Sequence, residues 1–155
     1  MNDVQEKMRK IFQEHYCVEV ELLQDGLIPL KAHSNDAGFD LYATSDIVVK
    51  PGEIVKHPLN LRMQLPRGTY AEITSKSGLG CKGLLIYSGI IDGGYRGVCH
   101  VVATNLSKED IVIQQHHKIA QMILHPFNTN YYMIEVDEVD TSSERGEGGF
   151  GSTGE

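Results

Sequence analysis

The spacing of apolar residues changes once along the chain, from a helical period to a strand period. In residues 4–15, the apolar residues Val4, Met8, Ile11 and Phe12 recur at helical spacing, and charged residues fill the opposite face. This pattern predicts an amphipathic helix. Its acidic and basic residues balance, which argues against a membrane-surface role and favours packing on its own subunit or on a neighbour.

Beyond Tyr16, short alternating or apolar runs predict strands, separated by turn signals such as Asp25-Gly26 and Lys50-Pro51-Gly52. The predicted strands cover residues 18–22, 47–49, 53–55, 61–65, 69–73, 98–104, 110–114, 119–125 and 131–136. Regular short strands of this kind are typical of an all-β barrel or sandwich.

After Val136 the composition becomes acidic and then rich in glycine and serine. Such a segment contains too little apolar surface to hold itself in place, so we expect a flexible tail. An inert end is the simplest interpretation, although Arg145 and Phe150 among five glycines are unusual in filler sequence. The predicted divisions are a helical extension (1–16), a β domain (17–136) and the tail (137–155).

The overall charge and size limit the classes of function. A chain of 155 residues suits one domain. A net charge of −7 argues against a nucleic-acid-binding surface. A nucleotide remains compatible, because a few local cations, backbone N–H groups and Mg²⁺ can hold a triphosphate.

Cysteine spacing and the absence of long apolar runs bear on the compartment. The three cysteines are widely spaced and match neither a disulfide framework nor a zinc pattern. We therefore expect small buried or half-buried residues in a reducing compartment. No run of 18 apolar residues and no secretory signal is visible, so we expect no membrane contact and an intracellular location: cytoplasm, nucleus or, if virally encoded, a virion.

The segment from Gly89 to Gly97 is the most informative one in the chain. It has glycines at both ends and in the middle, and apolar runs flank it at 83–87 and 98–102. Two apolar runs around a glycine-containing connection predict a β-hairpin. Asp92 and Tyr95 lie near its tip. Taken alone, Asp92 is most simply a residue that stabilises the turn through its own backbone.

Four further segments accompany this hairpin in a fixed order: 37–43, 75–80, 118–123 and 145–154. Their sequences are AGFDLYA, SKSGLG, KIAQMI and RGEGGFGSTG. With the hairpin third in line, the five resemble the motifs of the trimeric dUTPases, the dUTP nucleotidohydrolases, over about residues 37–154. The tail segment is not a phosphate-binding Walker A loop, because it lacks the GxxxxGK[ST] order.

For the hairpin, the resemblance implies a deoxyuridine site. Backbone groups of the hairpin, with Gly89, Ile90 and Ile91 among the binding residues, would pair with the uracil ring and leave little room for a C5 methyl group. Tyr95 would pack on the deoxyribose and exclude a 2′-hydroxyl. Asp92 would accept a hydrogen bond from the 3′-hydroxyl and act as general base toward the attacking water.

For the other motifs, the resemblance implies phosphate and metal binding. Asp40 would hold water ligands of a substrate-bound Mg²⁺, although a buried Asp bonded to turn amides is the alternative. The phosphate-binding residues would be Lys76, Ser77, Gly78 and Gln121. Most family members carry Arg where Lys76 and Lys118 stand here, and lysine lacks the bidentate fork of arginine. An ordinary polar turn and an alternating strand with an exposed lysine are the plain readings of these two segments.

The tail motif would close over the substrate. By resemblance, Phe150 would stack on the uracil and Arg145 would reach the γ-phosphate. Gly151, Ser152 and Thr153 would lie against the phosphates. Ordering of this tail would exclude water from the site.

Together these implications predict Mg²⁺-assisted hydrolysis of dUTP to dUMP and pyrophosphate, which keeps uracil out of DNA and supplies dUMP for dTMP synthesis. The expected fold is an all-β, jelly-roll-like clip, assembled as a homotrimer with active sites shared between subunits. Two alternatives remain: a related dCTP deaminase, and a non-catalytic binding protein on the same scaffold. The hairpin contains no Glu that could act as the deaminase proton shuttle.

Overall fold

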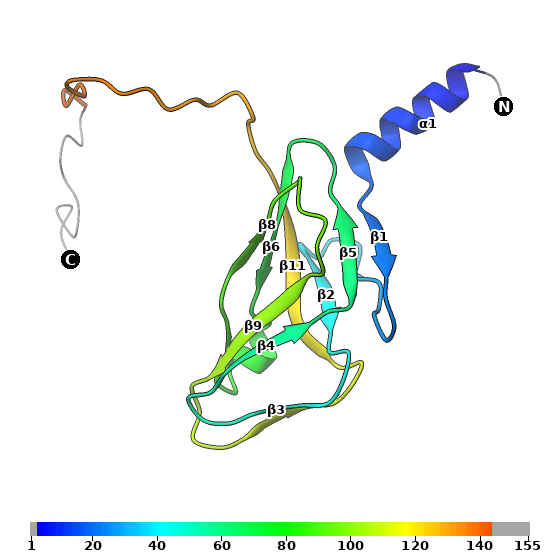
Figure 1. Ribbon diagram of the computed structural model, residues 1–155, viewed down its shortest axis with the longest axis vertical. Coiled ribbons are helices and arrows are strands. Elements are labelled where there is room, and N and C mark those ends of the chain that lie inside the picture. The colour runs from blue at the N-terminus through cyan, green and yellow to red at the C-terminus, as the bar shows by residue number, and fades with distance from the viewer. Residues whose placement is uncertain (1–2, 144–155) are drawn as a thin grey trace.

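A computed structural model describes residues 3–143, which form two main antiparallel sheets and a helix that stands apart (Figure 1). The helix, α1 (Asp3–Tyr16), confirms the amphipathic segment to within one residue at each end. Its Met8, Phe12 and Tyr16 side chains are exposed, and the rings of Phe12 and Tyr16 stack at 5.4 Å. These three side chains therefore do not pack on the chain's own sheets.

The predicted all-β fold is confirmed. One sheet has the order β2 (Gly38–Tyr42), β11 (Lys118–Pro126), β6 (Thr69–Thr74) and β8 (Gly89–Ile91). A second has the order β4 (Ile54–Pro58), β9 (His100–Asn105) and β7 (Leu84–Ile86). Two further pairs are β1 (Glu19–Leu22) with β5 (Leu61–Gln64), and β3 (Ile47–Val49) with β10 (Ile111–Ile113). A single turn of helix, α2 (Ser77–Gly80), lies between β6 and β7.

Alternating side chains build the core between these layers. In β5, Leu61 and Met63 are buried while Arg62 and Gln64 face solvent, as the two-residue period of a strand requires. The largest fully buried side chains come from most of the strands and include Leu41, Leu59, Leu61, Leu84, Ile119 and Met122. The fold thus fixes the strands whose outer faces carry the candidate site.

The predicted hairpin is only partly correct. Its flanking runs do pair, because β7 lies antiparallel to β9 with Leu84 opposite Asn105. The segment between them leaves that pairing: Gly89–Ile91 forms β8 and pairs instead with β6, Ala71 opposite Ile91. The connection therefore crosses from one sheet to the other, and its tip is a turn closed by a hydrogen bond from Tyr95 N to Asp92 O (3.0 Å).

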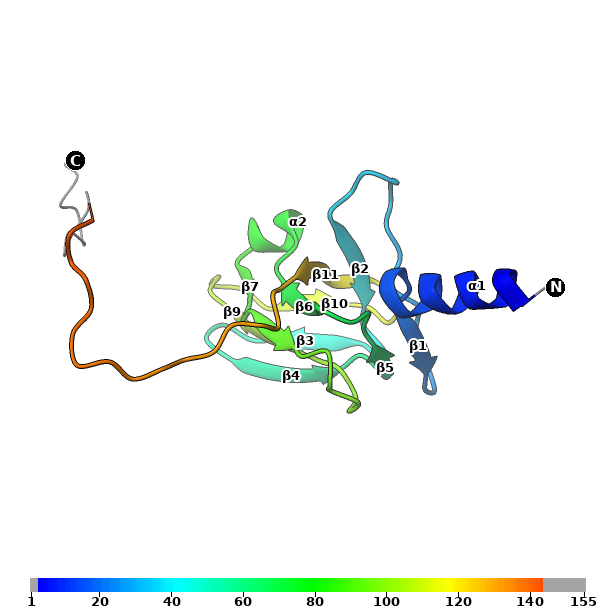
Figure 2. The same cartoon turned by 90° about the horizontal axis from the view of Figure 1, so that it is seen from above.

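The predicted strand at 131–136 is wrong for the single chain. The last strand ends at Pro126, and the segment beyond it runs away from the sheets (Figures 1 and 2). Its residues are β-branched and aromatic, but no strand of the described chain lies beside them to complete a ladder. Met133 is 98% exposed.

The three cysteines differ in burial. Cys99 is buried and Cys17 is half-buried as expected, whereas Cys81 is exposed, contrary to the prediction. Cys81 follows α2 at the surface, where no core strand covers it. Burial raises the pKa of the Cys99 thiol to about 11.

In the described part of the chain, no helix combines the length and apolar character needed to cross a membrane.

Candidate active site

Three strands place polar side chains in one row across the four-stranded sheet. Asp40 of β2 lies opposite Gln121 of β11, and Gln121 lies opposite Thr74 of β6. Directly paired residues point to the same face of a sheet, so segments far apart in sequence share one surface. Lys76 follows β6 by two residues and is brought to the same end of the sheet.

A β-bulge adds Lys118 to this surface. The register changes between Lys118, opposite Tyr42, and Ala120, opposite Leu41, so Ile119 is an extra residue. Lys118 and Gln121 are three residues apart and would face opposite sides of a regular strand. The bulge returns Lys118 to the face of Asp40, as bulges beside functional sites often do.

Asp40 is the centre of the resulting charge cluster. Its carboxylate is buried, and each oxygen meets one ammonium group: Oδ1 meets Lys76 Nζ, and Oδ2 meets Lys118 Nζ at 2.6 Å. Burial raises the pKa of Asp40, but the hydrogen bonds and charges of Lys118 and Lys76 outweigh burial and hold this pKa below its usual value. The hydrogen bond and charge of Asp40 in turn raise the pKa of Lys118.

Gln121 fixes the loop that carries Lys76. Its Nε2 donates a hydrogen bond to the backbone oxygen of Ser75 (2.9 Å). Ser75 Oγ in turn accepts from the backbone N–H of Ile86 (2.9 Å), which ties the loop to β7. Ser77 and Gly78 follow in α2 and are exposed. Lysine, hydroxyl and backbone N–H groups in this arrangement suit phosphate oxygens.

The hairpin forms a second group. Asp92 directly follows β8 and is exposed. The Tyr95 hydroxyl donates to the backbone oxygen of Val98 (3.1 Å), and the Tyr95 ring lies so close to Gly97 that any side chain there would collide with it. The Tyr95 side chain thus folds back over Gly97 and Val98, in the same turn as Asp92.

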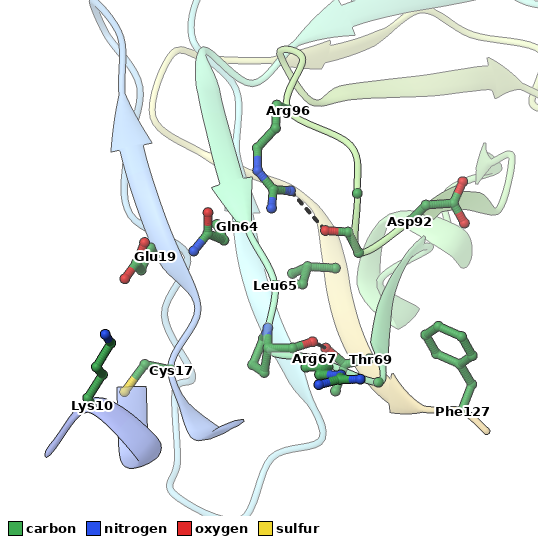
Figure 3. A pocket seen from close by; sticks show the side chains of 14 residues that line it. Lys10, Cys17, Glu19, Gln64, Leu65, Arg67, Thr69, Asp92, Arg96 and Phe127 are labelled. Carbon is green, nitrogen blue, oxygen red and sulfur yellow. Dashed lines mark hydrogen bonds between the residues drawn. The ribbon is translucent and has the colours of Figure 1, made fainter. Parts of the chain in front are cut away.

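Asp92 borders several cavities. One, of about 280 Å³, is lined by Gly89–Ile91, Asp92, Tyr95 and His100, among others. Another, of about 380 Å³, is lined by Tyr70, Ile90, Asp92 and Phe127. The largest of the three, of about 760 Å³, lies between the hairpin tip, β5 and α1, where Lys10, Arg67 and Arg96 also line it (Figure 3). Size alone favours the largest cavity, but the smallest contains the predicted nucleoside residues.

The structure thus brings Asp40, Lys76 and Gln121 together and places Asp92 beside Tyr95. The predicted tail residues, Arg145, Phe150, Gly151, Ser152 and Thr153, lie outside the described residues.

The sequence prediction missed Lys118 as a site residue. The resemblance placed Lys118 in the fourth motif, where most members carry Arg, but assigned it no contact, and the plain alternative was an alternating strand with an exposed lysine. Ile119 and Ala120 are consecutive apolar residues, but so are Met122, Ile123 and Leu124 of the same strand, so this pattern alone does not identify the bulge.

Metal binding by Asp40 is restricted by its partners. Residues 3–143 contain no cluster of three or more His, Cys, Asp or Glu side chains that could hold a metal ion. Both oxygens of the single carboxylate are engaged by ammonium groups. The donor set fits a magnesium ion that keeps water and phosphate as its direct ligands, once one ammonium group has moved aside.

Comparisons with known proteins agree on one family. A family model described as dUTPase matches residues 24–154. The chain is 42% identical over 145 residues to a deoxyuridine 5′-triphosphate nucleotidohydrolase of Clostridioides difficile, covering 90% of this chain and 99% of that protein. It is 36% identical over 141 residues to part of a Pol polyprotein of ovine maedi visna related virus, covering 91% of this chain and 13% of the polyprotein. Among solved structures, the dUTPase of Staphylococcus bacteriophage 80alpha with dUPNHPP superposes with a TM-score of 0.80 at 27% identity, covering 90% of this chain and 99% of that one.

Proposed function

The chain belongs to the dUTPase family, and from that premise we propose that it hydrolyses dUTP to dUMP and pyrophosphate. The observation that carries the proposal is the convergence of Asp40, Lys76 and Gln121 from three separate motifs at one end of one sheet. A cationic, donor-rich surface suits the phosphates of a nucleotide, and a small cavity lined by backbone groups and an aromatic side chain suits its nucleoside.

In the proposed reaction, the uracil and deoxyribose occupy the cavity at β8 and Tyr95. Backbone donors and acceptors at Gly89–Ile91 recognise the base, and a base with a mismatched polar pattern would leave buried groups unpaired. Lys76, Ser77, Gly78 and Gln121 bind the phosphates, and Gln121 also holds the Ser75 loop in place through its hydrogen bond to Ser75 O.

Asp92 carries the chemical step in this proposal. It orients a water molecule and accepts its proton as the water oxygen bonds to the α-phosphorus. The bond from the α-phosphorus to the bridging oxygen breaks, and pyrophosphate leaves. Mg²⁺ on the phosphates would neutralise charge on the leaving group, and Asp40 is the residue that would hold it through water. Positioning and charge neutralisation supply the catalysis without a covalent intermediate.

We further propose a homotrimer with shared sites, as the family resemblance implies. One subunit would supply the Asp40 cluster, a second the hairpin, and a third the tail with Arg145, Phe150, Gly151, Ser152 and Thr153. The exposed apolar side chains of residues 131–139 support association, because a lone chain leaves Tyr131, Tyr132 and Ile134 in water.

The first test is turnover of dUTP, dCTP, dTTP and UTP side by side with Mg²⁺, following nucleotide products, pyrophosphate and ammonia. Conversion of dUTP alone to dUMP is the expected result. Ammonia release from dCTP would identify a deaminase instead. Binding of dUTP without turnover of any substrate would identify a non-catalytic scaffold.

Replacing the proposed base tests its role directly. In Asp92→Asn we expect dUTP binding to persist and kcat to fall by about a hundredfold to ten-thousandfold, because the shape remains and the proton acceptor is lost. Asp25→Asn is the matched control: Asp25 has a positive φ of 62°, which asparagine also tolerates, and it lies in a different turn. A near-normal kcat in Asp92→Asn would remove Asp92 from this role.

A further inference from the structure

The lysines that would meet the triphosphate already have a partner within the chain. Asp40 holds Lys76 on one oxygen and Lys118 on the other. The Asp40 side chain is 8% exposed, so water can replace few of the contacts that it would lose. A carboxylate left unpaired at this depth is strongly disfavoured. The two ammonium groups therefore cannot turn to phosphate without a cost at Asp40.

We propose that Asp40 is an internal counter-ion that competes with the triphosphate for Lys76 and Lys118, which makes Lys118 a phosphate-binding residue of the site. The proposal rests on the proposed function, since it deepens the role of the same surface. It differs from a purely metal-holding Asp40, because the competition operates even when no metal ion is present.

The two lysines have unequal freedom to move. The Lys118 side chain is 46% exposed and that of Lys76 is 27% exposed. A more exposed ammonium group leaves its partner at less cost, because water screens and solvates it. Lys118 is therefore the group that turns first toward a phosphate, while Lys76 stays with Asp40 and contacts phosphate with its remaining N–H donors.

Binding without metal separates this proposal from the metal-holding role. The full-length protein is titrated calorimetrically with a non-hydrolysable dUTP analogue in EDTA. Asp40→Asn should bind the analogue about tenfold more tightly than the wild type, because both lysines are released and one negative charge beside the phosphates is removed. A carboxylate that acts only through a hydrated metal ion predicts no change under these conditions.

Lys118→Gln is an independent test, in which the affinity for the analogue should change in the opposite direction. It should weaken metal-free binding by about threefold to tenfold, because one phosphate-binding cation is lost. Glu21→Gln is the charge-matched control: it also removes one carboxylate, from an exposed pair with Arg62 on another sheet, and should leave binding unchanged. If it tightens binding as much as Asp40→Asn does, net charge is the cause and the proposal fails.

The outcomes also separate this inference from the proposed function. If the wild type binds no dUTP analogue even with Mg²⁺, the proposed function itself fails. If the wild type binds but Asp40→Asn binds equally or more weakly in EDTA, the counter-ion role is refuted. Thermal unfolding checks that Asp40→Asn is folded. If Asp40→Asn does not fold, Lys118→Gln decides the question by itself: metal-free binding equal to that of the wild type would refute the proposal.

Discussion

At the scale of single residues, His57 shows how burial sets a protonation state. His57 Nε2 accepts a hydrogen bond from the backbone N–H of Thr44 (3.0 Å), so the ring is neutral and carries its proton on Nδ1. Burial lowers the pKa of His57, and the charge of nearby His100 lowers it further. A protonated ring would lose the Thr44 contact.

The stability of the protein should therefore depend on pH through His57. Its pKa is below the ordinary value of 6.5 in the folded chain, so the unfolded chain takes up the proton first as the pH falls. The contribution is fully present above pH 6.5 and is lost as the pH falls through the lowered pKa of the folded state. In His57→Gln, the amide oxygen can accept the hydrogen bond from Thr44 but does not titrate. Urea unfolding should therefore show a smaller loss of unfolding free energy between pH 7.5 and 5.5 for this variant than for the wild type.

That comparison is made at one protein concentration, because association would also shift the transition. At pH 7.5 the substitution itself should cost about 1 kcal/mol, the size of one imperfectly replaced hydrogen bond. Equal losses in wild type and variant between the two pH values would assign the acid sensitivity to other groups.

At the scale of elements, the pairing of β2 with β11 explains why Gly38 lies beside the site. A Cβ atom on Gly38 would lie 2.5 Å from Gln121 Oε1. That is too close, so any side chain at this position must push Gln121 aside. The backbone of β2 is therefore part of the packing that aims the Gln121 side chain at the Ser75 loop.

Gly38→Ala should accordingly act on both substrate binding and folding. The shifted Gln121 would lose its hydrogen bond to Ser75 O, so we expect KM for dUTP to rise several-fold and the free energy of unfolding to fall by about 1 kcal/mol. Steady-state kinetics of Gly38→Ala, Gln121→Ala and the double variant check this. If the two changes act through one contact, KM for dUTP in the double variant is no higher than in the more severe single variant. Additive effects on KM would contradict the proposed coupling.

Local alternation predicted most strands because their burial follows the two-residue period, as in β5. Partner choice was not predictable in the same way. The local sequence from Gly89 to Ile91 does not determine whether this strand pairs with β6 or with the strand after the turn, because pairing depends on contacts between residues far apart in sequence. The bulge at Ile119 is a similar case: one extra residue moves Lys118 to the other face, and the shift becomes visible only in the pairing of β11 with β2.

The tail motif illustrates a different limit. Its glycine-rich sequence supported a function by resemblance, while its own composition gives no core and no strand pattern from which a position could be inferred. The roles of Arg145 and Phe150 accordingly stay predictions. Asp40, by contrast, was assigned to the site by resemblance, but its two lysine partners could be identified only once the sheet register was known.

At the scale of the whole molecule, the segment after β11 is the clearest sign of assembly. Residues 131–139 carry large apolar side chains that remain exposed in the single chain. The helix α1 adds exposed Met8, Phe12 and Tyr16 on another part of the molecule (Figure 2). Surfaces of this kind are normally covered by a partner, and a second copy of the chain is the partner that the proposed trimer supplies.

Light scattering of the full-length protein should therefore give three times the mass of one chain. Truncation after Ser143 should preserve that mass and the thermal midpoint while strongly reducing turnover of dUTP, because it removes only the proposed closing motif. Unchanged kinetics after truncation would make the tail inert. A purely monomeric protein with full activity would refute the shared-site arrangement.

The pairing of Asp40 with two lysines also bears on which anions the site retains between turnovers. Two unpartnered ammonium groups would attract inorganic phosphate and any passing nucleotide, since a point charge does not distinguish one phosphate from another. With a carboxylate already between them, weakly bound anions gain little by displacing it. Only a ligand that gains further contacts, from a base in the cavity and a chain of several phosphates, can do so. The buried carboxylate of Asp40 would thus increase selectivity by weakening the binding of anions that make no further contacts with the site.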